Sequence, residues 1–231
     1  MKWTLITFLW KSILRKEDKI KNHLHKIHRT KDEKNYSDEF LCLDRNERQM
    51  PFSNDFINEL REIPFDHLIR NYPNQNELLD ELSSITGFKK NSHLITPGAD
   101  AAIKSIFEAL TEEGDNILCL NPTYQMYGIY AKIYRCNVIA LDLDINFKLN
   151  LNKLQELLVN TKFIFLANPN QPTASLVPRT DIINILNLAK KHKTTVVIDE
   201  AYYPFSGTSS ISLLNQFKNL IIIRSYSKAF G

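Results

Sequence analysis

The stretch "LIIIRSYSKAFG", residues 220–231, joins an apolar run to a polar turn that carries a lysine. The run 220–223 has the length and the composition of a buried strand. Ser225, Ser227 and Lys228 follow this run directly. In parallel sheets, ligand sites gather beyond the carboxyl ends of the strands. The stretch therefore predicts a parallel sheet with a lysine at its functional edge.

Upstream of this stretch, short apolar runs alternate with helical patterns. Strands are predicted at Leu220 to Ile223 and over residues 117–120, 138–143, 163–167 and 195–198. Helices are predicted over residues 76–86, 99–111, 152–159 and 180–192. This alternation predicts an α/β fold with a mostly parallel, doubly wound sheet and helices on both faces.

Chemically active side chains follow the predicted strands. The segments are "NPTYQMY" (121–127), "NPNQPTA" (168–174), "DEAYYPF" (199–205) and "RSYSKAFG" (224–231), and "ITPGADAAI" (95–103) leads into a predicted helix. A parallel sheet would collect an aspartate, a lysine, aromatic rings, hydroxyls and a glycine-bearing helix start at one edge. This edge is where we expect a ligand site.

Composition and charge narrow the classes of protein. The chain has 231 residues, of which 43% are hydrophobic and 24% charged, as in an ordinary soluble globular protein. A net charge of +3 does not argue for nucleic acid as a partner. Cys42, Cys119 and Cys136 have no CxxC spacing, so we expect no disulfide framework, no metal site and a cytoplasmic location.

The first 39 residues differ from the rest and are predicted to form a basic, helical N-terminal extension. "MKWTLITFLWKSILRK" (1–16) is too short to span a bilayer and lacks a signal-cleavage site. It suits a helix packed on the body or on a partner, or an interfacial anchor with Trp3, Phe8 and Trp10 at a membrane surface. His23, His25 and His28 stand among basic residues and suit a solvated helix face better than a metal site.

The ordered motifs G-A-D, P-T-Y-x-M-Y, N-P-N-x-P-T, D-E-A-Y and S-x-S-K-A-F resemble one family. It is that of the fold type I, class I/II aminotransferases that depend on pyridoxal phosphate (PLP), and the histidinol-phosphate aminotransferase group is the most similar. The resemblance runs from about Leu43 to Gly231, so residues 40–231 are expected to hold the N-terminal arm and part of the PLP-binding large domain. Members continue past S-K-A-F to a phosphate-binding arginine and a small C-terminal domain. We therefore expect the chain to be incomplete relative to the family.

The resemblance implies roles for residues at the predicted edge. Lys228 matches the lysine that forms the internal Schiff base, and Asp199 matches the carboxylate that pairs with the pyridine nitrogen. Tyr202 matches the phenol that binds the ring hydroxyl, and Tyr124 matches the aromatic ring that stacks on the cofactor. Gln171 stands where the family usually has asparagine, and its longer side chain offers the same amide.

Further matches concern the phosphate, the substrate and the partner subunit. The phosphate cradle would consist of Gly98, Ala99, Asp100, Ser225 and Ser227. Tyr72 matches a tyrosine that reaches the phosphate of the neighbouring subunit, which implies a homodimer with shared active sites. Asn46 lies in a segment that resembles the substrate-proximal arm, although the inserted Met50 makes that assignment loose.

Taken together, the complete protein is expected to be an aminotransferase of the histidinol-phosphate type. It would move an amino group between an amino acid and a 2-oxo acid or a phosphorylated ketone. Two alternatives remain open: a PLP-dependent decarboxylase of the threonine-phosphate type, and a non-catalytic binding module that works through its N-terminal extension.

Overall fold

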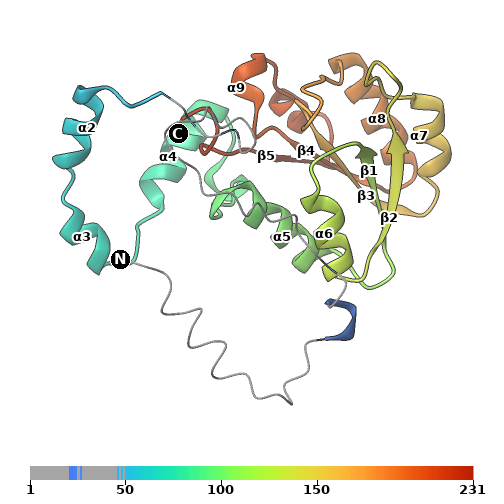
Figure 1. Cartoon of the computed structure of the whole chain (residues 1–231), viewed down its shortest axis with the longest axis horizontal. Helices are drawn as coiled ribbons and strands as arrows, with labels where there is room; N and C mark the ends of the chain where they lie inside the picture. Colours follow the sequence, from blue (N-terminus) through green and yellow to red (C-terminus); the bar gives the residue numbers. More distant parts are fainter. Residues whose placement is uncertain (1–20, 25–26, 28–45, 47, 49, 231) are drawn as a thin grey trace, which may run out of the picture.

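A five-stranded sheet forms the centre of the molecule (Figure 1). The computed structural model describes residues 21–24, 27, 46, 48 and 50–230. The strands are β1 (Asn116–Asn121), β2 (Asn137–Asp142), β3 (Thr161–Ala167), β4 (Thr195–Asp199) and β5 (Leu220–Ile223). These are the five strands that the apolar runs predict, and all are confirmed to within a few residues.

All four strand pairings are parallel, in the order β2-β1-β3-β4-β5. The chain first moves outward from β1 to β2 and then returns past β1 to form β3, β4 and β5 in sequence. The direction of winding reverses between β1 and β3, which is the position where doubly wound sheets bind ligands. The predicted α/β class with a doubly wound parallel sheet is confirmed.

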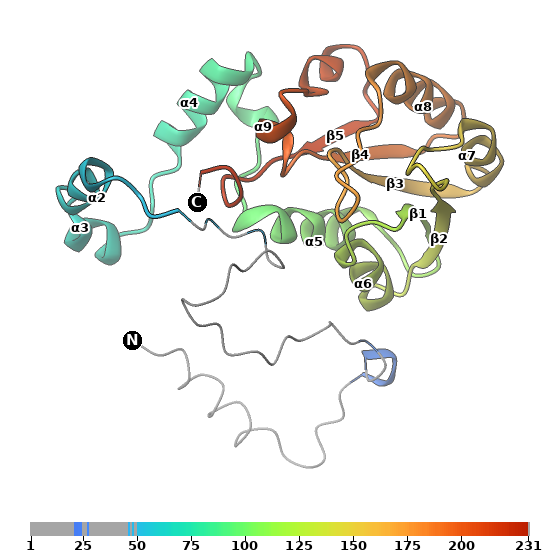
Figure 2. The same cartoon turned by 45° about the horizontal axis from the view of Figure 1, so that its top comes forward.

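Helices flank the sheet and continue beyond one end of it (Figures 1 and 2). The α-helices are α2 (Asn54–Arg61), α3 (Phe65–Arg70), α4 (Asn76–Thr86), α5 (Gly98–Leu110), α6 (Met126–Ile133), α7 (Leu151–Leu157), α8 (Arg179–Lys191) and α9 (Tyr203–Ser206). Short 3-10 helices are η1 (Asn22–Leu24), η2 (Lys90–Ser92) and η3 (Ile211–Asn215). Helices α2 and α3 stand apart from the sheet in both views.

Each face of the sheet has its own hydrophobic cluster. Alternate strand residues point to opposite faces, so Ile164 joins the cluster under α7 and α8, while Phe165 joins the cluster under α5 and α6. The central strand β3 is buried over most of its length. Two buried faces explain why the strands read as continuous apolar runs in the sequence.

Aromatic side chains fill the cluster under α5 and α6. The ring of Phe165 stacks on Phe107 at a centroid distance of 5.1 Å and on Tyr127 at 5.2 Å. All three side chains are fully buried. This stack joins β3 to both helices of that face, and it supports Tyr127 at the carboxyl edge of the sheet.

Local capping explains several helix boundaries. The Ser53 side chain accepts the Phe56 N–H at the start of α2, and Asn150 accepts two N–H groups at the start of α7. Gly87 ends α4 in the left-handed conformation, with φ of 75°. Helices α2, α3, α6 and α9 were not predicted, because each is at most eight residues long.

Most predictions about the N-terminal extension fall outside the described residues. This holds for the helix over residues 1–39, for Trp3, Phe8, Trp10, His25 and His28, and for Cys42. His23 is described, and its ring bonds to the Ile133 carbonyl at 3.1 Å and to Arg135 Nε at 3.3 Å, beside the end of α6. Within the described part of the chain, no helix has both the length and the apolar composition needed to cross a membrane.

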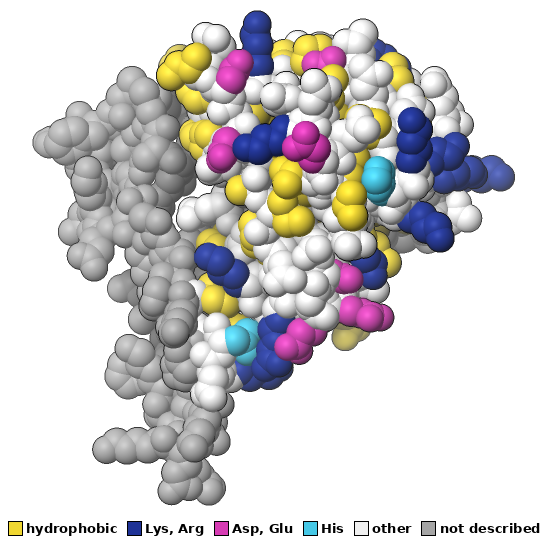
Figure 3. All heavy atoms as spheres, turned by 90° about the vertical axis from the view of Figure 1, so that its right-hand side faces the viewer, with side chains coloured by type: hydrophobic (Ala, Val, Ile, Leu, Met, Phe, Trp, Pro, Cys, Tyr) yellow, Lys and Arg dark blue, Asp and Glu magenta, His cyan; other side chains and the backbone are white. Residues whose placement is uncertain are grey.

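The surface shown in Figure 3 carries charges of both signs, with apolar side chains scattered between them. In one ion pair of the protein, Arg135 Nη1 lies 3.0 Å from Glu113 Oε2, and both side chains are largely exposed. Exposed pairs of this kind contribute about 0–1 kcal/mol to stability. The buried clusters, and not the surface charges, therefore stabilise the fold.

We predict that Phe165→Ala lowers the free energy of unfolding by about 3–5 kcal/mol, because it opens a cavity between β3, α5 and α6. Phe205→Ala is the matched control, since that ring is 68% exposed and its loss should cost about 0.5 kcal/mol or less. Urea denaturation measures both values. Equal losses for the two variants would contradict this account of the core.

Candidate functional site

The register of the sheet brings the predicted site segments together. Asp199, the last residue of β4, pairs with Ala167 on one side and with Ile223 on the other. The segments that begin at Asn168, Glu200 and Arg224 therefore leave the sheet from neighbouring positions. Asn121, at the end of β1, contributes a fourth segment to the same edge.

Asp199 is a buried carboxylate at this edge, with 6% of its surface exposed. One carboxylate oxygen accepts the Tyr127 hydroxyl at 2.9 Å, and the other accepts the Ala201 N–H at 3.0 Å. Among residues 50–230 and the few described before them, no lysine, arginine or histidine forms an ion pair with this carboxylate. Within the described part of the chain, this carboxylate is thus buried with hydrogen bonds but without a countercharge.

Burial raises the pKa of Asp199 above its ordinary value of 3.8, because the charged form loses its hydration. The hydrogen bonds from Ala201 and Tyr127 oppose this rise, and the nearby charges of Asp100 and Glu200 add to it. A cation placed against Asp199 would favour the charged form and reverse the shift. The site is therefore suited to a positively charged group.

Sequence reasoning assigned Tyr127 no role at the site, although its side chain lies against Asp199. It does pack in the core, yet its hydroxyl also donates to Asp199. Burial and the Asp199 charge raise the pKa of Tyr127 well above 10, so the hydroxyl keeps its proton. The second tyrosine of P-T-Y-x-M-Y was the available signal, since Met126 and Tyr127 begin a helix directly after the strand segment.

A second chain of hydrogen bonds joins three predicted residues. The Tyr202 hydroxyl donates to Gln171 Oε1 at 2.9 Å, and Asn46 Nδ2 donates to the Tyr202 hydroxyl at 2.9 Å. Residues 46 and 202 are far apart in the sequence, so this contact ties the N-terminal arm to the carboxyl edge of the sheet. The structure brings Asn46, Gln171 and Tyr202 together as expected for one site.

Asn170, the neighbour of Gln171, is used to hold two loops together. Its side chain accepts the Thr123 hydroxyl at 2.7 Å and donates to the Pro122 carbonyl at 3.0 Å and to Thr173 Oγ1 at 2.8 Å. With 3% of its surface exposed, Asn170 is committed to these contacts. Gln171 is thus the amide that reaches Tyr202.

Helix α5 begins at the predicted phosphate cradle. Gly98 starts the helix with φ of 80°, a left-handed conformation that favours glycine. Asp100 does not cap the helix, and its carboxylate accepts the Tyr124 hydroxyl at 2.7 Å. The Tyr124 ring meets Tyr127 edge to face at a centroid distance of 5.7 Å. Asp100 and Tyr124 are therefore linked to the Tyr127–Asp199 pair.

Lys228 lies in the turn that follows β5, and its side chain is half-buried. The Phe230 N–H donates to the Tyr226 carbonyl at 3.2 Å and closes this turn around the lysine. The hydroxyl oxygens of Ser225 and Ser227 lie 2.6 Å apart. The turn and the first residues of α5 lie on the same side of the sheet in Figures 1 and 2. Gly98, Ala99, Ser225 and Ser227 are thus placed at one end of the site.

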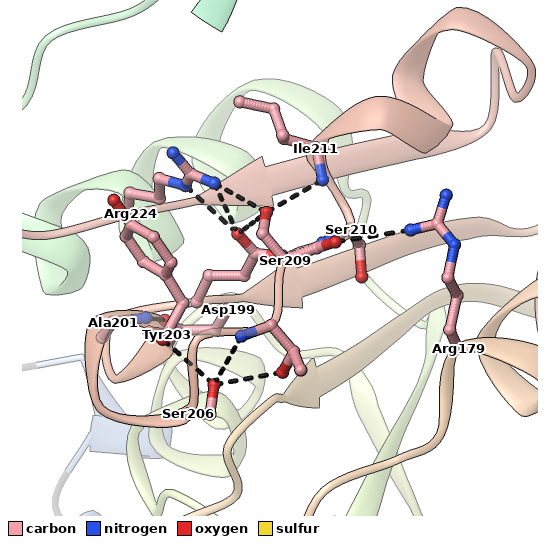
Figure 4. Close-up of polar contacts among 11 residues, drawn as sticks. Arg179, Asp199, Ala201, Tyr203, Ser206, Ser209, Ser210, Ile211 and Arg224 are labelled. Atoms are coloured by element: carbon pink, nitrogen blue, oxygen red, sulfur yellow. Dashed lines mark hydrogen bonds and ion pairs between the residues drawn. The ribbon is translucent and has the colours of Figure 1, made fainter. Parts of the chain in front are cut away.

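Glu200 and Arg224 form an ion pair beside Asp199, which the sequence did not point to. Arg224 Nη2 lies 3.1 Å from Glu200 Oε2, and Glu200 is 1% exposed. Figure 4 shows Arg224, Tyr203 and Ser209 gathered around this contact, next to Asp199 and Ala201. The pair connects the segment after β4 with the segment after β5.

Tyr72 is the one predicted site residue that stands apart. It lies between α3 and α4 and is fully exposed. No contact with the other predicted residues is described for it. Within one chain the structure therefore brings together all the predicted site segments except that of Tyr72.

A parallel sheet of this topology, with a buried aspartate at the end of β4 and a lysine in the turn after β5, has the arrangement of an aminotransferase large domain. The sequence model of the family "Aminotransferase class I and II" matches residues 46–231. The chain belongs to the class I and II aminotransferase family. The predicted family membership is thereby confirmed.

Similar proteins carry a more particular name. The chain is 34% identical over 196 residues to a histidinol-phosphate aminotransferase of Clostridium novyi, covering 83% of this chain and 54% of that protein. It is 40% identical over 157 residues to that of Buchnera aphidicola subsp. Cinara cedri, covering 67% and 44%. The histidinol-phosphate aminotransferase structure from Sinorhizobium meliloti in complex with pyridoxal-5'-phosphate shares the fold, with a TM-score of 0.71 at 21% identity, over 81% of this chain and 52% of that one. The chain spans about half the length of the curated relatives it matches.

We predict that Asp199→Asn raises the stability of the protein at neutral pH when no ligand is added. Since the folded state raises the pKa of Asp199 above 3.8, stability falls as pH rises through that raised pKa. Asparagine removes this loss, and each 1 kcal/mol gained raises Tm by about 2–4 °C in a chain of this length.

Differential scanning calorimetry across the acid to neutral range measures the effect. The difference between the variant and the wild type should shrink toward acid pH, where the wild-type carboxyl is protonated. A variant that is less stable at neutral pH, with an unchanged difference in acid, would contradict the cost assigned to the buried charge.

Proposed function

We propose that the protein carrying this chain is a PLP-dependent aminotransferase of the histidinol-phosphate type. One observation carries the proposal: Asp199 and Ile223 are register partners, so a buried carboxylate and the Lys228 turn leave adjacent strands at the same edge. A cofactor with a cationic ring nitrogen and an aldehyde requires these two groups.

The site fits PLP in its charge as well as in its residues. Asp199 is buried without an ion pair among the described residues, and its pKa is raised for that reason. A protonated pyridine nitrogen would supply the missing countercharge. When bound, PLP supplies an aldehyde that a lysine amine captures with loss of water, and a ring that accepts electron density from the substrate.

Lys228 is the proposed nucleophile and the proposed carrier of the α-proton. Its side chain is half-buried, and a backbone hydrogen bond closes the turn that carries it, which favours a held amine. An amine that is held in position attacks more efficiently, because it loses little entropy on reaching the transition state. After releasing the cofactor to a substrate amine, the same group would accept the proton from Cα.

Tyr202 and Gln171 are proposed to bind the ring hydroxyl of the cofactor. Their side chains already touch each other, so a ligand oxygen could join an existing hydrogen-bond chain. Tyr124 is proposed to stack on the ring, and its bond to Asp100 restrains its phenol from the outer end. Tyr127 holds the Asp199 carboxylate from the core side.

The phosphate is proposed to bind at the start of α5. Free N–H groups of the first helical turn and the positive end of the helix dipole attract anions. Gly98, Ala99 and Asp100 supply this turn, and Ser225 and Ser227 supply hydroxyl donors from the turn after β5. The Gly98 N–H already donates to the Thr96 carbonyl at 2.7 Å. Among the described residues no side chain caps this helix end, so the Ala99 and Asp100 N–H groups are the proposed donors.

The proposed substrates are an amino acid, together with a 2-oxo acid or a phosphorylated ketone. Support comes from the names of the relatives at 34% and 40% identity. Asn46 is proposed to face the substrate, because its arm reaches Tyr202. These assignments concern the whole protein, of which the chain matches about half.

A homodimer and a cytoplasmic location complete the proposal. Tyr72 is fully exposed, and α2 to α4 expose further large apolar side chains, namely Phe56, Phe65, Ile69 and Ile85. Such a surface suits a partner subunit, and Tyr72 is proposed to contact the phosphate of the cofactor bound there.

Cys119 and Cys136 are buried free thiols, as in proteins of a reducing compartment. The proposed division into an extension, residues 1–39, and an aminotransferase part, residues 40–231, accords with the family match from residue 46.

We predict that borohydride reduction of the protein with PLP leaves the pyridoxyl group on Lys228. The protein in its natural full length should show a visible absorbance band, and peptide mass spectrometry should then find the label on the peptide that contains Lys228. Lys228→Ala should lose the band and the label, because no other described lysine is placed in the turn after β5.

Lys218→Ala is the matched control, since that lysine is exposed and precedes β5 at the opposite edge of the sheet. It should keep both the band and the label. A label distributed over surface lysines with none at Lys228, or an undiminished band in Lys228→Ala, would overturn the proposed function.

A further inference from the structure

Glu200 connects three separate segments at the edge of the sheet. One carboxylate oxygen accepts the Ser210 N–H, and the other accepts the Ser209 hydroxyl at 2.8 Å and Arg224 Nε at 3.1 Å. The Glu200 N–H donates to the Ile223 carbonyl at 2.8 Å. Glu200 thus holds the loop before η3 and the strand end of β5 in place at the same time.

The Arg224 guanidinium group is held by contacts to Nε, to Nη2 and to one of its faces (Figure 4). Besides Glu200, it donates to Ser209 Oγ at 2.6 Å, and its planar head lies 4.0 Å from the centre of the Tyr203 ring. Cation–π stacking and charge-assisted hydrogen bonds are both stronger in such a partly buried place than in water. Arg224 therefore has a defined orientation.

The ion pair joins the two segments that carry the proposed chemistry. Glu200 follows Asp199 in the chain, and Arg224 precedes Ser225 and stands four residues before Lys228. Asp199 and Ile223 are already register partners in the sheet. The pair extends this alignment past the last backbone hydrogen bond between the two segments, which runs from the Glu200 N–H to the Ile223 carbonyl.

Charge gives the pair a second effect on the site. Glu200 lies close enough to Asp199 for its negative charge to raise the pKa of Asp199. Arg224 is the ion-pair partner of Glu200 in the described part of the chain and offsets that charge. Without the guanidinium, two uncompensated buried carboxylates would be adjacent in sequence, which is unfavourable for both.

From these contacts we infer that Arg224 is a positioning residue: through Glu200 it sets the Lys228 turn relative to Asp199, and so determines how the amine meets the cofactor. This inference rests on the proposed function. Neither residue contacts the cofactor in this role. A purely structural ion pair would affect stability alone, whereas a positioning pair also changes the spectrum and the affinity of bound PLP.

The experiment compares Arg224→Gln, Glu200→Gln and the double variant in the protein at its natural full length. Arg179→Gln is the matched control, because Arg179 donates to Ser212 Oγ and to the Ser209 carbonyl but contacts neither Glu200 nor the Lys228 turn. PLP binding is followed by its visible absorbance, which gives both the dissociation constant and the wavelength of the maximum. Calorimetry of the same samples records stability separately.

Arg224→Gln should weaken PLP binding by about tenfold and shift the absorbance maximum, since coupled side chains give effects of this size in double-mutant cycles. The double variant should bind no more weakly than Arg224→Gln alone. Arg179→Gln should match the wild type in both readings. Losses that multiply in the double variant, or an unchanged spectrum and affinity in Arg224→Gln despite a lower Tm, would overturn the inference.

Hydrogen exchange on the protein without PLP provides a test that does not depend on the proposed function. Peptides that cover residues 224–230 should exchange faster in Arg224→Gln than in Arg179→Gln, because the turn loses its anchor to Glu200. Unchanged exchange would overturn the inference. A wild-type protein that forms no PLP band would instead refute the proposed function, whatever the exchange shows.

Discussion

The hydrogen bond from the Tyr127 hydroxyl to the Asp199 carboxylate is the interaction on which the site depends. This bond satisfies one oxygen of a carboxylate that is buried inside the protein, at the end of strand β4. The aromatic stack of Phe107, Phe165 and Tyr127 holds the donor, so the core of one sheet face supports the chemistry of the edge. A charge buried without an ion pair is costly, and this cost is what makes the site receptive to a cationic ligand.

The fold was predictable because each strand is buried on both faces and reads as an apolar run, as Thr195 to Ile198 shows. The site residues were predictable as far as they follow strands or form motifs. The hydroxyl of Tyr127 was not, since its partner is 72 residues away and only the folded core sets their distance. The short helices α2 and α3 were missed because they have only eight and six residues and bury none of the described side chains.

The Glu200–Arg224 pair shows a second limit of sequence reasoning. Each residue looks like an ordinary charge beside a motif, and only the register of β4 and β5 shows that they meet. Backbone bonds align strands only along their length. Side chains must therefore align the segments beyond the strand ends, and here Asn170 does so for β1 and β3 while Glu200 does so for β4 and β5.

Nitrogen NMR of the protein with PLP labelled at its ring nitrogen tests the central claim most directly, because it reports on the atom that Asp199 is proposed to meet. The account predicts that the ring nitrogen is protonated at neutral pH in the wild type and unprotonated in Asp199→Asn. A ring nitrogen that is unprotonated in the bound wild type, or equally protonated in both proteins, would contradict the role assigned to the buried carboxylate.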